Sequence, residues 1–319
     1  MAHQRREIEG CKMKIRAFIT HKKAEHFGDC QDRFRINQDT KSVAVADGMS
    51  QSYQQKIWAS LLVEKYVNTV NFVPNNESIR ELSAYWHSMV ISFINDLKEK
   101  NAPPYLIIMN ENSLALQNSA GATFLGIRFE GQKWKGDVLG DSSLIEIKDG
   151  NIGRILTSQP ESEFDNYPDY FDSNPNKTGK GTSKPIEGIL DDRTFIMLVS
   201  DPFSDFLNEK KKEGNEQEFV SEIMQLTNHQ DFESLVARWR DEYDMHNDDS
   251  TLVIIEYDGA DDFNCVYIDD IDRLIQLDNF KILIDKELTD SGINIPENFP
   301  YEKIFDKLFK QNYYGITNF

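Results

Sequence analysis

The chain is poor in cysteine and in long apolar runs, and each scarcity excludes a class of protein. Its three cysteines, Cys11, Cys30 and Cys265, are odd in number and contain neither a close pair nor a Cys-x-x-Cys motif. A disulfide framework or a zinc cluster is therefore not expected. No apolar segment follows Arg5 and Arg6, and no run of about 18 apolar residues occurs, so we expect a cytoplasmic protein without a membrane helix.

Basic residues are also scarce relative to acidic ones. The 319 residues include 35 Lys and Arg against 54 Asp and Glu, which gives a formal net charge of −19. This charge repels nucleic-acid phosphates and anionic membranes, so we expect neither as a partner, whereas cations are favoured. The hydrophobic share of 39% and the length are those of a soluble protein with a substantial core.

Aspartates recur at the ends of apolar runs. The run Val43–Ala46 is typical of a buried strand and stops at Asp47, after which Gly48 supplies a sharp turn. Taken alone, Asp47 is better explained as a turn aspartate that closes a strand. The same pattern recurs far apart in the chain, at Asp141, Asp201, Asp248 and Asp249. Because carboxylates gathered from several strand ends suit hard cations, the sequence predicts a site for Mg²⁺ or Mn²⁺.

The apolar periodicity predicts strands, then helices, then strands again. A hairpin of 34–36 and 42–46, with 37–41 as its turn, is expected to bring Asp32 and Asp47 to one rim. Residues 157–192 are polar and irregular, which is typical of a lid or of disorder, and Lys210–Lys212 is expected to be solvated. The other elements expected are strands at 14–20, 122–128, 134–139, 143–147, 195–199 and 251–256, and helices near 57–67, 78–98, 105–117, 216–227 and 231–243.

Six short motifs occur in a characteristic order: Gln31-Asp32, Ala46-Asp47-Gly48-Met49-Ser50, Ser119-Ala120-Gly121-Ala122-Thr123, Leu139-Gly140-Asp141-Ser142, Val199-Ser200-Asp201 and Asp248-Asp249-Ser250-Thr251. Together they resemble the motifs of the metal-dependent serine/threonine phosphatases of type 2C, in particular a bacterial branch. The resemblance implies an α+β fold, a four-layer α/β/β/α sandwich of two antiparallel sheets flanked by helices. It would occupy residues 1–258, followed by a C-terminal accessory extension at 259–319.

The resemblance also implies hydrolysis of phosphomonoesters by a water that two or more Mg²⁺ or Mn²⁺ ions activate. Asp47 would bridge the ions, the Gly48 carbonyl would ligate, and Asp201 and Asp248 would bind the first ion. Asp32 would contact the second ion through water, with Asp141 and Asp249 as auxiliary residues. His21 has either a structural role or a role as phosphate contact or general acid. A phosphorylated protein as substrate, a kinase as partner and a role in bacterial signalling are implied as well.

Some positions depart from the family pattern. Pro202 replaces the glycine of Ser-Asp-Gly, Ser50 and Gln51 replace a Gly-Gly pair, and Phe27 stands near the place of a phosphate-binding arginine. These changes favour an alternative, a pseudophosphatase that binds or scaffolds a phosphorylated partner. A small-molecule phosphohydrolase is the third hypothesis. Cys30 is expected to be a packed, inert thiol.

Residues 259–319 contain apolar runs near 280–284 and 304–309. Side chains of this kind need a surface to cover. We expect the extension to pack on the phosphatase-like domain and to supply no metal ligand. Binding of a partner protein by the same apolar residues is the alternative.

Overall fold

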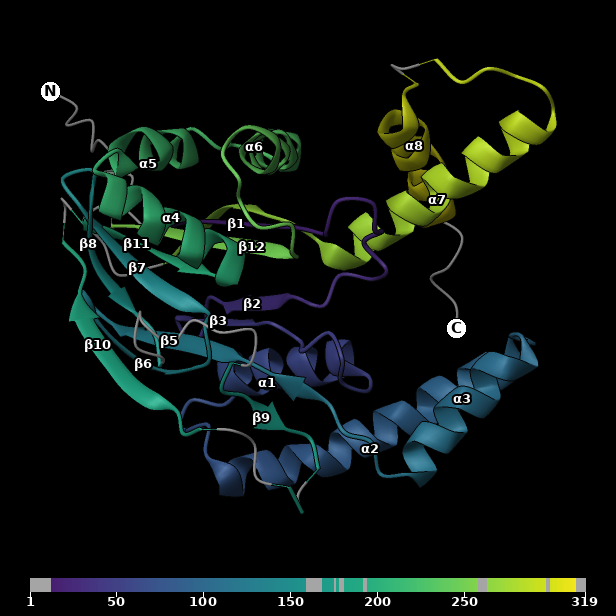
Figure 1. Ribbon diagram of the computed structural model, residues 1–319, viewed down its shortest axis with the longest axis horizontal. Coiled ribbons are helices and arrows are strands. Elements are labelled where there is room, and N and C mark those ends of the chain that lie inside the picture. Colours follow the sequence, from purple (N-terminus) through teal and green to yellow (C-terminus); the bar gives the residue numbers. More distant parts are fainter. Residues whose placement is uncertain are drawn as a thin grey trace, which may run out of the picture.

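The computed structural model describes residues 13–158, 168–174, 176–177, 181–191, 194–257, 263–296 and 299–313. Cys11, the boundary predicted at 258/259 and part of the predicted lid lie outside the described residues. Two sheets are stacked face to face, and helices cover the outer face of each (Figure 1). The predicted four-layer sandwich is therefore confirmed.

The first sheet has six strands within the described residues, and its central strands are buried on both faces. Neighbouring strands are antiparallel except for β1 and β13, which run parallel. In order across the sheet the strands are β13 (Phe263–Ile268), β1 (Met13–Thr20), β12 (Ser250–Glu256), β11 (Thr194–Val199), β7 (Ser143–Lys148) and β8 (Asn151–Leu156).

The second sheet is antiparallel throughout and contains the predicted hairpin. Arg33 pairs with Ala46 at the open end of this hairpin, so the residues that flank the pair, Asp32 and Asp47, lie side by side. In order its strands are β10 (Lys184–Ile189), β6 (Lys133–Leu139), β5 (Phe124–Glu130), β3 (Ser42–Ala46) and β2 (Arg33–Asn37), and a small separate sheet pairs β4 (Gly121–Ala122) with β9 (Phe171–Asp172).

Three apolar cores hold the layers together. One lies between the sheets, where Val43 and Val45 of β3 share a cluster with Leu198 of β11 and Val253 of β12. The second packs the first sheet against α4 (Asp201–Glu213), α5 (Glu216–Met224) and α6 (His229–Glu242). The third packs the second sheet against α1 (Gln55–Asn68) and α2 (Asn76–Glu99), and α3 (Pro104–Ala115) lies against α2.

β10 and α4 are two of the segments that differ from the prediction. Residues Lys184–Ile189, expected to be irregular, form β10 and pair with β6, because backbone hydrogen bonds to a neighbour can make a strand without an apolar run. Helix α4 begins at Asp201, before the first helix expected there. Within it Lys210 is only 9% exposed, since its ammonium lies over the Phe206 and Phe219 rings, 5.3 and 5.7 Å from their centroids, and also pairs with Glu213. Solvation of the whole lysine run was therefore a wrong prediction.

The C-terminal residues join the main fold. β13 extends the first sheet, and Ile271 and Leu274 of α7 (Ile271–Asp290) enter the core between the sheets. Helix α8 (Tyr301–Tyr313) packs back on α7, with the Phe280 and Phe305 rings 5.6 Å apart. The α7–α8 pair projects from the sandwich at the right of Figure 1. None of the described helices combines the length and apolarity that crossing a membrane requires.

Candidate metal centre

The strand-end aspartates meet at one rim of the sandwich. Asp47 follows β3, and its backbone is fixed by Thr123, whose amide donates to the Asp47 carbonyl over 2.9 Å. Asp201 follows β11 as the first residue of α4, and Asp248 and Asp249 precede β12, the neighbour of β11. The charges of Asp201 and Asp248 both act on Asp47, so these carboxylates lie near one another at the rim.

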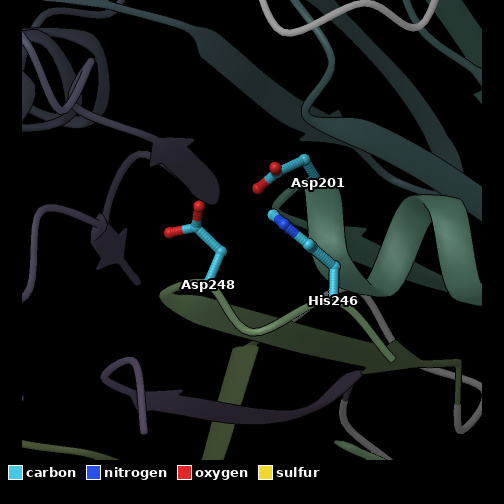
Figure 2. Close-up of side chains that lie close together, drawn as sticks. All are labelled: Asp201, His246 and Asp248. Carbon is cyan, nitrogen blue, oxygen red and sulfur yellow. The ribbon is translucent and has the colours of Figure 1, made fainter. Parts of the chain in front are cut away.

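Asp201 and Asp248 form a compact group with His246, a residue that no sequence motif indicates. One ligand atom from each of the three residues lies within 4.8 Å of the other two. Figure 2 shows Asp201 at the start of α4, and His246 and Asp248 on the loop that leads from α6 into β12. Two carboxylates and an imidazole at this spacing can hold one divalent cation.

The pKa values of Asp47 and Asp201 are both raised. Burial raises the pKa of Asp47 well above its ordinary value, and the charges of Asp32, Asp201, Asp141 and Asp248 raise it further. Burial likewise raises the pKa of Asp201, followed by the charges of Asp141 and Asp248. Carboxylates held together in this way repel one another unless a cation or protons neutralise them.

Asp32 and Asp141 each present a buried oxygen to this cluster. Asp32 is fully buried and its Oδ2 accepts a hydrogen bond from Thr251, but its Oδ1 finds no partner among the described residues. Oδ1 of Asp141 is also buried and has no partner within the described part of the chain. Burial and the charge of Asp249 raise the pKa of Asp32 to about 7, and burial and Asp205 raise that of Asp141 to about 6. Orphaned carboxylate oxygens beside further carboxylates fit a divalent cation.

Asp249 and Asp248 differ in what their side-chain oxygens contact. Its Oδ1 accepts from the Lys22 amide over 3.0 Å and its Oδ2 accepts from the Gln31 amide over 2.7 Å. Both Asp249 oxygens therefore bind the backbone of the segment that precedes β2. Oδ1 of Asp248 instead lies 2.9 Å from the Lys22 ammonium, so that Lys22 places a positive charge at the rim.

Gly48 is enclosed directly beside Asp47. It forms a β-bridge with Ala122 of β4. A Cβ atom at this position would lie 3.0 Å from Cγ of Gln55 and 3.1 Å from the Gln31 carbonyl oxygen. The close packing accounts for glycine here, and the role of its carbonyl as a ligand stays a prediction.

His21 and Cys30 lie on the segment before Asp32. The His21 ring packs edge-on against Phe27 at 4.6 Å, and its Nδ1 lies 2.8 Å from the Lys22 carbonyl oxygen. These contacts orient the ring within its own loop, so a direct part in chemistry stays a prediction. Cys30 is fully buried, and burial raises the pKa of its thiol well above the ordinary value. A thiol in this state is a poor nucleophile.

No family model and no curated protein matches the chain. Among solved structures, the S. agalactiae serine/threonine phosphatase matches with 12% identity and a TM-score of 0.48, covering 77% of this chain and 100% of that one. PppA of Pseudomonas aeruginosa, described as a key regulatory component of T6SS, matches with 11% identity and a TM-score of 0.49, covering 77% of this chain and 98% of that one. The chain is similar to bacterial serine/threonine phosphatases.

A third match is the catalytic domain of the serine/threonine protein phosphatase PstP, in complex with two manganese ions. It is 13% identical, with a TM-score of 0.45, and covers 77% of this chain and 99% of that one. The first and the third of these matches are described as serine/threonine phosphatases. At such identities the likeness concerns the fold, so the chemistry follows from the carboxylates themselves.

Proposed function

We propose that the protein is a metal-dependent phosphomonoester hydrolase that acts as a protein serine/threonine phosphatase. The observation that carries the proposal is the set of buried and half-buried carboxylates at one rim, of which Asp32 and Asp141 each present an unpartnered oxygen. Desolvated carboxylates within reach of one another are costly, and a divalent cation is the partner that lowers this cost.

The residues available to the ions differ in their surroundings. Asp47 and the Gly48 carbonyl stand at the end of β3, where Asp47 interacts with the other carboxylates. Asp201, His246 and Asp248 form a compact group, and the charges of Asp201 and Asp248 act on Asp47. When bound, two or more Mg²⁺ or Mn²⁺ ions would activate a water molecule for attack on phosphorus.

The protein's own side chains prepare the rim for an anionic substrate. The Lys22 ammonium lies between Asp248, at 2.9 Å, and the Ser50 hydroxyl, at 3.2 Å. Burial opposes its charge, but the hydrogen bond to Asp248 and the neighbouring carboxylates raise the pKa of Lys22, so it stays cationic at neutral pH. In a protein of net charge −19, a fixed cation at the rim favours the approach of a phosphate group.

A pseudophosphatase is the second candidate, and the position of Phe27 favours it. This side chain is only 4% exposed and packs against the His21 and His229 rings, at 4.6 and 5.5 Å. Residue 27 therefore presents no charge to a phosphate, whereas the Lys22 ammonium stands at the rim beside Asp248.

The test is hydrolysis of p-nitrophenyl phosphate with Mn²⁺, with Mg²⁺ and after chelation by EDTA. We expect turnover that requires metal and is lost in Asp201→Asn. Phosphoserine and phosphothreonine peptides should be hydrolysed in preference to phosphotyrosine peptides. Turnover that survives chelation would contradict the metal-dependent mechanism. Tight phosphopeptide binding without any hydrolysis would instead support the pseudophosphatase.

A further inference from the structure

Residues 21–32 form a loop that borders the candidate metal centre at both of its ends. Near one end the Lys22 ammonium contacts Asp248, and at the other end Asp32 belongs to the carboxylate cluster. Both ends are tied to Asp249, which accepts hydrogen bonds from the Lys22 and Gln31 amides. The position of this loop therefore determines where the Lys22 ammonium and the Asp32 carboxylate lie at the rim.

The tip of the same loop is tied to the C-terminal extension. Oδ2 of Asp278, on α7, accepts a hydrogen bond of 3.1 Å from the Phe27 amide. The same oxygen lies 3.3 Å from Nδ1 of His26. Asp278 is one of the half-buried residues of α7, with 18% of its side chain exposed, so water competes weakly for this contact.

Apolar packing also holds the loop tip against α7, in addition to the contact with Asp278. The Phe27 side chain belongs to the core cluster between the sheets, and Ile271 and Leu274 of α7 belong to the same cluster. Phe27 and α7 are therefore held together by burial, while Asp278 fixes the backbone at the loop tip. On the side of α1, the Lys56 ammonium donates to the Gly28 carbonyl over 2.5 Å.

We propose that Asp278 is a positioning residue for the metal centre. By holding the tip of the 21–32 loop it restricts where Lys22 and Asp32 lie, so that α7 contributes to metal binding without supplying a ligand. The inference rests on the proposed metal centre. It gives the C-terminal extension an influence on the metal centre. Neither the strand-end aspartates nor the contacts among the site carboxylates indicate this influence.

The test compares Asp278→Ala, Asp278→Asn and a control, Glu287→Ala, in the full chain. Glu287 is an exposed carboxylate on the same helix, so its removal changes the charge equally. Two quantities are measured: amide hydrogen exchange of the peptides that cover 21–32, and Mn²⁺ affinity by calorimetry. Neither requires phosphatase activity, so failure of the proposed reaction leaves this test intact.

We expect exchange in the 21–32 loop to rise about tenfold in Asp278→Ala, as lost anchoring of a local segment allows. Mn²⁺ affinity should fall about fivefold, because Lys22 and Asp32 must then be ordered on binding. Asp278→Asn keeps an oxygen that can accept from the Phe27 amide, so it should stay close to wild type, as should Glu287→Ala.

Other outcomes would overturn the proposal. Unchanged exchange in Asp278→Ala would show that Asp278 does not hold the loop. Faster loop exchange with unaltered Mn²⁺ affinity would show that the loop is not coupled to the metal centre. A uniform rise in exchange, including β7 and β11, would show that Asp278 merely stabilises the fold.

Discussion

The Asp32 carboxylate accepts a hydrogen bond of 2.8 Å from the hydroxyl of Thr251, a residue 219 positions further along the chain. Asp32 precedes β2 of the second sheet, and Thr251 lies in β12 of the first. Both residues are fully buried, so this bond joins the two sheets at the rim. It also fixes one oxygen of Asp32, while the other has no hydrogen-bond partner among the described residues.

Asp47→Asn should weaken metal binding. The substitution removes one negative charge from the centre of the cluster while keeping the size of the side chain. We expect fewer Mn²⁺ ions bound, or weaker binding, in a calorimetric titration. If the proposed activity is present, the rate should fall about a hundredfold or more, which corresponds to the loss of several kcal/mol of transition-state stabilisation.

Asp149→Asn is the matched control for this experiment. Asp149 is an exposed residue in the turn between β7 and β8, where its φ of 50° suits asparagine equally well. Asp149→Asn therefore removes one negative charge, as Asp47→Asn does, but at a site away from the rim. Identical stoichiometry and affinity in wild type and Asp47→Asn would show that Asp47 is not a ligand.

His246→Ala should lower the affinity for Mn²⁺ more than that for Mg²⁺. An imidazole is a good ligand for transition metals, whereas Mg²⁺ prefers oxygen ligands and water. We expect a loss of about tenfold for Mn²⁺ and little change for Mg²⁺, because only Mn²⁺ binds a nitrogen ligand well. Calorimetry with each ion measures both affinities.

His87→Ala serves as the control because His87 is an exposed residue on α2, in the layer of helices that covers the second sheet. Equal affinities for both ions in all three proteins would mean that the proximity of His246 to Asp201 and Asp248 has no role in metal binding.

The sequence predicted the hairpin and the carboxylate rim because both depend on local signals. The turn at 37–41 fixes the pairing of β2 with β3, and an aspartate at the end of an apolar strand lies at a sheet edge whatever the rest of the chain does. Helix α4 also had a readable signal, since Phe203, Phe206 and Leu207 follow helical spacing and Pro202 suits a helix start.

The remaining features arise from contacts between distant residues. His246 is a single histidine in a polar loop, and only the return of the chain from α6 to β12 brings it to Asp201. The hydrogen bonds of Asp249 go to the backbone amides of residues 22 and 31, which carry no side-chain signal in the sequence. β10 lacks an apolar run and depends on pairing with β6. None of these can be inferred from local periodicity.

His229 should make the stability of the protein depend on pH. Burial opposes the charge on its imidazole, but hydrogen bonds to Asp269 and Glu233, and their charges, raise the pKa of His229 from 6.5 to about 9. Its Nδ1 lies 2.9 Å from Asp269 Oδ2, and its Nε2 lies 3.3 Å from Glu233 Oε1. The folded state thus retains a proton that the unfolded chain releases.

The stabilisation is complete below pH 6.5 and is lost as the pH rises through 9. His229 should therefore contribute a decline of about 3 kcal/mol to the free energy of unfolding over this window. Urea denaturation at several pH values measures the decline, which should be much smaller in His229→Gln and unaltered in His87→Gln. The same decline in His229→Gln as in wild type would rule out this ion-paired group as its source.

Removal of the extension should destabilise the protein in two distinct steps. A chain that ends at Asp290 loses α8 and the contact of Phe305 with Phe280, but keeps β13 and α7. A chain that ends at Tyr257 also loses the parallel partner of β1 and four buried side chains, Phe263, Ile271, Leu274 and Leu277.

Each of these buried side chains contributes about 1.5–3 kcal/mol, so their joint loss is comparable with the net stability of a typical domain. The chain ending at Tyr257 should therefore be unfolded or aggregated. The chain ending at Asp290 should fold with a melting temperature lower by a few degrees and should bind Mn²⁺ like wild type, because Asp278 remains. Thermal denaturation of both chains measures these losses of stability, and calorimetry measures their Mn²⁺ affinity. A soluble, equally stable chain ending at Tyr257 would show that the extension is dispensable for the fold and would favour its other predicted use, the binding of a partner protein.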